Sequence, residues 1–147
     1  MIDEKLFEQL KLAVPQATFP APFAQKFNLD IIEFRKGHAK AEAIVDETWT
    51  NPFGIAHGGF LFTMLDEILG TACCSVLMQP IYADTKSLST TNHDIFFHSP
   101  AKPGDKLLIK GRITSARKNM IFVEGHIEQK DSGVLVAESK GIWFVKR

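Results

Sequence analysis

The longest apolar stretch of the chain, residues 58–78, has almost the length of a membrane span but carries Asp66 and Glu67 near its centre. Its apolar residues come in pairs spaced four positions apart: Phe60-Leu61, Met64-Leu65, Ile68-Leu69, Ala72-Cys73 and Val76-Leu77. Because four residues turn a helix through about 400°, this paired stripe drifts by about 40° per repeat and covers much of the helix surface. We therefore predict one long helix that the rest of the chain encloses. The two central carboxylates argue against a helix that crosses a bilayer.

Six further segments have the alternation or the composition of β-strands. The clearest is 38–46, where small apolar residues alternate with polar ones as in a half-buried strand. The six predicted strands are Asn28–Arg35, His38–Asp46, Ser87–His98, Lys106–Arg117, Met120–Gln129 and Val134–Lys146. Turn-forming residues separate them, and a short amphipathic helix, Asp3–Val14, precedes them.

The predicted order is two strands, the long helix and then four strands. A curved antiparallel sheet wrapped around one central helix would bury the wide apolar surface of that helix, which is an α+β fold. Short connections favour an antiparallel meander for the last four strands. The length of 147 residues predicts a single domain spanning 1–147.

Charge and cysteine content argue against several classes of function. Seventeen basic and seventeen acidic residues give a formal net charge of zero, which offers no attraction to nucleic acid. The two cysteines, Cys73 and Cys74, are neighbours, so we expect free buried thiols. His93 and His98 lie five positions apart on one predicted strand, so we expect them on opposite faces rather than as metal ligands. The N-terminal stretch has no signal-peptide pattern, which predicts a cytoplasmic protein.

A narrow polar strip interrupts the apolar surface of the predicted helix. It contains small or polar residues: Thr63, Asp66, Gly70, Thr71, Cys74 and Ser75. Small residues allow another backbone or a thin ligand to approach closely. Asp66 on this strip either reaches solvent at the rim or faces an enclosed site, where a carboxylate needs polar partners. The helix pattern leaves both interpretations open.

The glycine pair at the start of the predicted helix also has two interpretations. Gly58 and Gly59 either allow a tight turn into the helix or let a substrate carbonyl approach the unpaired N–H groups there. Eight residues of helix separate Gly58 from Asp66, which is about 12 Å. A base and an oxyanion donor must both lie within about 3 Å of the reacting group. If both act in one site, they must come from different subunits, and the protein must be at least a dimer.

These residues carry a resemblance to a known family. The run Asn51-x-x-Gly54-x-x-His57-Gly58-Gly59, with Asp66 seven residues further on, resembles the signature of hotdog-fold acyl-CoA thioesterases, most closely the PaaI-like subgroup. The stretch TTNHDIFFHSPAKPGD, residues 90–105, is similar to the next strand and turn of that family. The resemblance covers nearly all of the chain beyond the first twenty or so residues.

The resemblance implies a role for five residues. Asp66 would be the general base or the nucleophile, and the Gly58 N–H would polarise the thioester carbonyl. Asn51 would orient the reacting groups, His57 would hold the turn, and the Thr90 hydroxyl would orient the water or the carboxylate. The substrate would be a coenzyme A thioester, with no metal and no other cofactor. Family members form dimers with composite sites across the interface, and such dimers often pair into tetramers.

Two other functions remain open from the sequence. A hotdog hydratase or dehydratase would use a histidine such as His57 together with Asp66, and a non-catalytic module would bind acyl-CoA without hydrolysis. The predicted strand after the helix carries Asn92, His93 and Asp94, which is more polar than the alternating strand expected there. This departure leaves the lining of the pocket, and with it the acyl group, undetermined.

Overall fold

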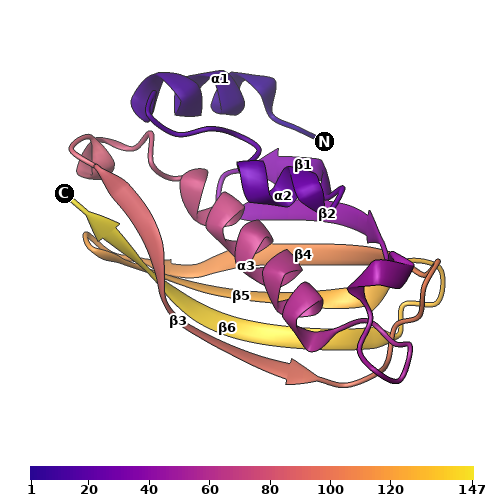
Figure 1. Cartoon of the computed structure of the whole chain (residues 1–147). Helices are drawn as coiled ribbons and strands as arrows, with labels where there is room; N and C mark the ends of the chain where they lie inside the picture. The colour runs from indigo at the N-terminus through magenta and orange to yellow at the C-terminus, as the bar shows by residue number, and fades with distance from the viewer.

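The computed structural model describes all 147 residues, and its long helix α3 (Gly58–Cys74) lies along the concave face of a six-stranded antiparallel sheet (Figure 1). The strands are β1 Asp30–Arg35, β2 His38–Ile44, β3 Ser87–Phe97, β4 Lys106–Ala116, β5 Met120–Gln129 and β6 Leu135–Lys146. Two short helices, α1 (Glu4–Ala13) and α2 (Pro22–Lys26), precede the sheet. The α+β fold with one enclosed helix is confirmed, whereas α2 had no counterpart in the prediction.

Helix α3 ends four residues before the end of the apolar stretch from which it was predicted. The Ser75 hydroxyl donates to the Ala72 carbonyl at 2.6 Å and accepts the Gly37 N–H at 2.7 Å. This side chain therefore replaces backbone bonds that a continuing helix would make. It also ties the end of α3 to the turn between β1 and β2.

The sheet order is β1-β2-β4-β5-β6-β3, so the predicted four-strand meander was wrong for β3. Strands β4, β5 and β6 pair with their chain neighbours, but β3 pairs with β6 at the far edge, and β4 pairs with β2. Residues 98–105 carry the chain across to β4, passing the start of α3, where the Ala101 carbonyl accepts the Ala56 N–H at 2.8 Å. This order lets the sheet curl around α3 from both sides, and the burial of the helix outweighs the preference for pairing between chain neighbours.

Glycines on two central strands let α3 approach the sheet closely. A Cβ atom added at Gly111 would lie 3.1 Å from Leu69 Cδ2, and one at Gly125 would lie 3.0 Å from the same atom. At Gly125 it would also lie 2.6 Å from the Lys110 carbonyl oxygen, a distance that real Cβ atoms do not adopt. The core therefore depends on the absence of side chains at these two positions.

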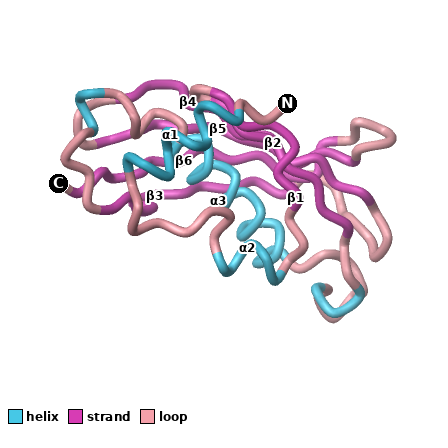
Figure 2. The backbone as a smooth tube through the Cα atoms, turned by 90° about the horizontal axis from the view of Figure 1, so that it is seen from above, coloured by secondary structure: helices cyan, strands magenta, loops and turns pink.

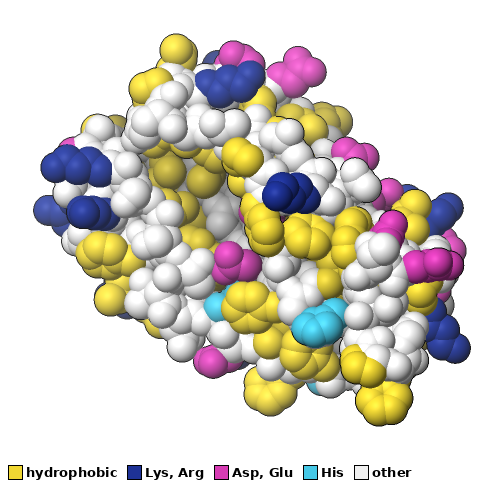
Figure 3. All heavy atoms as spheres, viewed as in Figure 1, with side chains coloured by type: hydrophobic (Ala, Val, Ile, Leu, Met, Phe, Trp, Pro, Cys, Tyr) yellow, Lys and Arg dark blue, Asp and Glu magenta, His cyan; other side chains and the backbone are white.

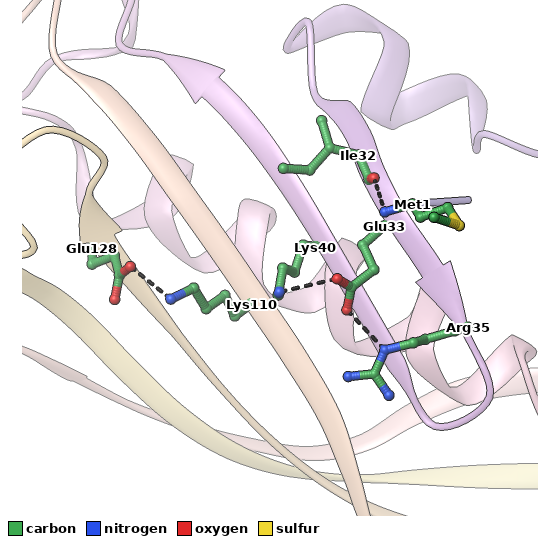
Figure 4. Close-up of polar contacts among 7 residues, drawn as sticks. All are labelled: Met1, Ile32, Glu33, Arg35, Lys40, Lys110 and Glu128. Carbon is green, nitrogen blue, oxygen red and sulfur yellow. Dashed lines mark hydrogen bonds and ion pairs between the residues drawn. The ribbon is translucent and has the colours of Figure 1, made fainter. Parts of the chain in front are cut away.

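The outer face of the sheet is polar and carries charged side chains in pairs (Figure 4). Glu33 on β1 accepts from Arg35 at 3.1 Å and from Lys40 on β2 at 3.0 Å. Lys110 on β4 pairs with Glu128 on β5 at 2.7 Å. Such partly exposed ion pairs contribute little to stability. Their effect is to keep this face polar, so that the hydrophobic core lies on the concave side only.

The N-terminal segment is attached to the edge strand β1 and, together with α3, lines a cavity. Ile2 pairs in parallel with Phe34 of β1, and the Asp3 N–H donates to the Phe34 carbonyl at 2.8 Å. Helix α1 then buries Leu10 completely. Seen from above, α1 lies over the same side of the sheet as α3 (Figure 2). The segment thus covers the concave side of the sheet between its two edge strands, β1 and β3.

Candidate active site

The loop before α3 is held in shape by Asn51. Its Oδ1 accepts the N–H of Phe53 at 2.9 Å and that of Ile55 at 3.4 Å, and its own N–H donates to the Ile55 carbonyl at 2.8 Å. Gly54 within the loop has φ +73°, a conformation that favours glycine. The Nδ2 group of Asn51 makes no hydrogen bond with the protein, so it remains available to a bound molecule.

His57 caps the start of α3. Its Nδ1 accepts the Gly59 N–H at 2.8 Å, which satisfies one of the unpaired donors at a helix start. The Gly58 N–H, the first of the helix, has no acceptor in the chain. It lies where the helix dipole is positive. The helix start therefore presents a free donor of the kind that stabilises an oxyanion.

Asp66 lies midway along α3, and its two carboxylate oxygens have different surroundings. Oδ1 accepts the Thr90 hydroxyl at 2.8 Å and lies 3.4 Å from His93 Nδ1. Oδ2 makes no hydrogen bond with the protein. The side chain is 39% exposed. One oxygen is therefore held by the protein while the other is free to take a proton or to attack a substrate.

Thr90 and His93 both reach Asp66 because β3 has a bulge at Thr91. The register between β3 and β6 runs Thr90–Trp143, Asn92–Ile142 and His93–Gly141. Thr91 has no partner, and the extra residue shifts the alternation of the strand by one position. Thr90 and His93, which a regular strand would send to opposite faces, consequently both face α3.

A cavity of about 700 Å³ opens beside Asp66. Its polar end includes Asp66, Glu67 and Thr90. Four residues of the predicted polar strip of α3 form one wall, whereas Thr63 and Ser75 do not line the cavity. Apolar side chains from α1, β1 and the loops around α2 line much of the rest: Phe7, Leu10, Val14, Phe19, Leu29 and Phe34. Hydrophobic side chains line a hollow in the surface, with an acidic side chain at its edge (Figure 3). The volume and the mostly apolar lining are typical of a small-molecule site.

The turn between β3 and β4 supports the loop before α3. Asp105 Oδ2 accepts from Gln129 Nε2 at 2.8 Å and from the Lys102 N–H at 2.8 Å, and these hydrogen bonds lower the pKa of the Asp105 carboxyl. The same turn supplies the Ala101 carbonyl that binds Ala56. The two motif segments noted in the sequence are therefore hydrogen-bonded to each other.

The five predicted site residues fall into two groups in the structure. Asp66 and Thr90 meet, whereas Asn51, His57 and Gly58 gather at the start of α3. Because α3 is one unbroken helix, Gly58 and Asp66 are about 12 Å apart along its axis. Within one subunit the two groups do not converge on a single reacting carbonyl.

His93 is the site residue that sequence reasoning missed. The signal was present in the polar run from Asn92 to Asp94, but an unbulged strand would not have turned His93 toward Asp66. His98 lies on the other face, 40% exposed and 3.2 Å from Glu138, so the expectation of opposite faces is confirmed.

Cys73 and Cys74 are free thiols, as expected, but only Cys73 is fully buried, whereas Cys74 is half-buried and lines the cavity. Burial raises the pKa of both, that of Cys74 to about 12, so neither is a reactive thiolate. No helix in the structure is long and apolar enough to cross a membrane.

Glu67 is a half-buried carboxyl at the edge of the cavity, and it makes no hydrogen bond or ion pair with the protein. Burial raises the pKa of Glu67, and the neighbouring Asp66 charge raises it further. The folded protein therefore holds the proton on Glu67 more tightly than the unfolded chain does, in which the pKa of a glutamate is 4.5. The contribution of this proton to the stability of the fold is fully present below pH 4.5. It is lost as the pH rises from there through the raised pKa of the folded state.

Glu67→Gln is accordingly expected to raise the thermal midpoint by a few degrees at about pH 7.5, since glutamine carries no charge to bury. At about pH 4, where the folded wild type already holds the proton, the two midpoints should nearly coincide. Thermal denaturation at both pH values checks this. If the thermal midpoints of variant and wild type differ equally at both pH values, burial of the Glu67 charge is not the cause of the difference.

A helix enclosed by a six-stranded antiparallel sheet, with a carboxylate midway along the helix and an apolar cavity beside it, defines a hotdog-fold protein with a candidate hydrolytic site. Residues 53–136 match the family model of the thioesterase superfamily, and this span includes α3 and β3. The match covers more than half of the chain. The chain belongs to the thioesterase superfamily and is a thioester hydrolase.

Similar proteins agree with this assignment. Acyl-coenzyme A thioesterase 13 of Homo sapiens is 26% identical over 113 residues, covering 76% of each chain. The PaaI protein of Escherichia coli, from the phenylacetic acid degradation operon, superposes with a TM-score of 0.79 at 20% identity, covering 97% of this chain and 96% of that one. A protein of Streptococcus pneumoniae, described as a hypothetical thioesterase and solved with coenzyme A, gives a TM-score of 0.69 at 28% identity, covering 81% and 89%.

Proposed function

We propose that the protein hydrolyses acyl-coenzyme A thioesters to a carboxylic acid and free coenzyme A. The observation that carries this proposal is Asp66, which lines a largely apolar cavity and whose Oδ1 is held by Thr90 while Oδ2 has no protein partner. The family and the coenzyme A bound to the Streptococcus pneumoniae protein support a coenzyme A thioester as substrate. Its acyl group would occupy the cavity beneath α1.

The chemistry follows from the two groups of site residues. Asp66 Oδ2 takes a proton from water as the water oxygen attacks the thioester carbon. The Gly58 N–H stabilises the oxyanion that forms, and Asn51 Nδ2 supplies a further donor. The carbon–sulfur bond then breaks, the thiolate leaves, and the proton held by Asp66 neutralises the thiolate. Direct attack by Oδ2, which gives an anhydride that water hydrolyses, is the alternative route.

Such a site needs two copies of the chain. Gly58 and Asp66 of one subunit are about 12 Å apart, so one thioester must use Gly58 of one copy and Asp66 of the other. Strand β3 supports this arrangement because it is an unpaired sheet edge of 11 residues. Phe96 and Phe97 at its end are 66% and 53% exposed, which is typical of an interface. A dimer through β3, and a pairing of dimers into tetramers, are therefore our predictions.

A hydratase built on His57 and Asp66 is less consistent with the geometry. His57 Nδ1 accepts the Gly59 N–H, so this nitrogen is not available as a base for a substrate proton. An acyl-CoA binding module remains the main competitor, because the cavity alone would serve it equally well.

The test is release of thiol from a panel of aryl-, short-, medium- and long-chain acyl-CoAs. We expect turnover on at least one class, and the ranking identifies the acyl group. Absence of release above background from all of them, with well-folded protein, would contradict hydrolysis and favour the binding module.

Thr90→Val tests the partner of Asp66 without changing the shape of the side chain. Loss of a hydrogen bond to a charged group is expected to lower kcat by about 10- to 100-fold. Thr91→Val is the matched control, because Thr91 lies at the bulge, is exposed, and makes no side-chain hydrogen bond. Equal effects of the two substitutions on kcat would show that Thr90 acts through the strand and not through Asp66.

A further inference from the structure

His93 has the most unusual surroundings of any polar side chain in the molecule. Its imidazole is only 1% exposed, and neither ring nitrogen has a hydrogen-bond partner. The ring lies between two aromatic side chains, with centroid distances of 4.4 Å to Phe62 and 5.7 Å to Trp143. Asp66 Oδ1 lies 3.4 Å from His93 Nδ1.

Packing alone does not account for a histidine at this position. A buried polar group without a partner costs about 1–3 kcal/mol, and an apolar side chain of similar size would avoid that cost. The surroundings would suit an apolar side chain, because the neighbouring rings of Phe62 and Trp143 are apolar. Gly141, which pairs with His93 across the strands, leaves the space that the Trp143 ring fills. Strain of this kind is expected where function requires it.

The geometry around Asp66 shows what the imidazole can do. Thr90 and His93 approach the same oxygen, Oδ1, from the same face of β3, and both owe this orientation to the bulge at Thr91. A single hydrogen bond from Thr90 leaves the carboxylate free to rotate about it. A second donor on Oδ1 would hold the carboxylate plane and keep Oδ2 pointing at the substrate. Hydrogen bonds in empty sites are often long and tighten when substrate binds.

We propose that His93 is a positioning residue for Asp66: its Nδ1–H donates to Oδ1 when substrate occupies the site and so fixes the direction of Oδ2. The inference rests on the proposed function. His93 itself does not touch substrate, because its ring is enclosed by Phe62 and Trp143. Its effect is therefore on kcat and not on substrate affinity.

Three substitutions separate this role from packing. In asparagine the side-chain amide can occupy the position of Nδ1, in glutamine it reaches the position of Nε2, and leucine has no donor. We expect His93→Leu to lower kcat by about 10-fold or more, as the loss of a hydrogen bond to a charged group predicts, with KM changed less than about twofold. His93→Asn should recover most of the activity, and His93→Gln should not.

Thermal stability should rank the variants in a different order. His93→Leu removes a buried polar group without a partner, so its midpoint should equal or exceed that of the wild type, whereas His93→Asn should be less stable. A variant that is more stable but slower cannot be explained by disturbed packing. If kcat instead follows stability, so that His93→Leu is as active as the wild type, the proposal is overturned.

The tautomer of His93 gives a second readout that does not need turnover. Nitrogen-15 NMR of the wild-type protein should show a proton on Nδ1, and a proton on Nε2 alone would overturn the inference. Failure of the inference about His93 can be distinguished from failure of the proposed hydrolysis. A wild type that hydrolyses acyl-CoA but tolerates His93→Leu refutes only the role of His93, whereas a wild type without turnover refutes the hydrolysis and leaves the tautomer to decide the placement.

Discussion

Asp66→Asn is expected to lower kcat for acyl-CoA hydrolysis by about 10²- to 10⁴-fold, the range over which a positioned general base contributes. Asparagine has the same shape, and its oxygen can still accept the Thr90 hydroxyl that now holds Oδ1 at 2.8 Å. The change removes only the basicity and the negative charge. Thiol release under saturating substrate measures the loss.

Binding should survive this substitution. The cavity walls and the helix start are unchanged, so the affinity for coenzyme A measured by calorimetry should stay within about threefold of the wild type, a difference of less than 1 kcal/mol. Asp94→Asn serves as the matched control, because this exposed carboxyl on β3 lies next to His93 in sequence and points away from α3. Full activity of Asp66→Asn would remove Asp66 from the chemistry and with it the proposed mechanism.

Gly58→Pro is expected to lower kcat by about 10²- to 10³-fold, as the loss of an oxyanion donor does elsewhere. Proline is tolerated at the first position of a helix, where it removes the free N–H and adds a Cβ. The preceding residue, His57, has φ −64° and ψ 136°, which suits a residue before proline. Gly58→Ala is the matched control, because it adds a Cβ 3.3 Å from the Phe97 ring but keeps the N–H.

Mixing the two inactive variants should restore activity if the site is shared between subunits. A heterodimer of Asp66→Asn and Gly58→Pro subunits has one site with both groups intact and one with neither. Random association then gives about a quarter of the wild-type activity per subunit, since half of the dimers are mixed and each has one working site. Co-expressed and separately purified samples, compared at equal concentration, measure the restoration. Activity no higher than that of either variant alone would place both groups in one subunit or exclude the dimer.

Local pattern was sufficient for the long helix and the six strands, although not for α2 or for the end of α3. The apolar pairs between Phe60 and Leu77 predicted α3 because helix periodicity is a property of nearby residues, and the alternation around Ala41 predicted β2 for the same reason. Predicted strand bounds agree with the structure to within two residues. The central part of the polar strip of α3, from Asp66 to Cys74, lines the cavity, whereas Thr63 and Ser75 at its two ends do not.

Local sequence pattern did not predict which strands pair with one another. The preference for chain neighbours predicted β3 beside β4, but β3 pairs with β6, because enclosing α3 depends on surfaces far apart in the sequence. Likewise, the bulge at Thr91 follows from the register against β6 and cannot be read from β3 alone.

By itself, therefore, the sequence determined a long enclosed helix, six strands, a carboxylate on a polar strip and a family to compare it with. Only the tertiary structure decided that Thr90, and not Thr91, binds Asp66, and that His93 lies buried beside them. The physical reason is that periodicity is set by neighbouring residues, whereas the direction of a side chain on a bulged strand is set by pairing with a distant strand.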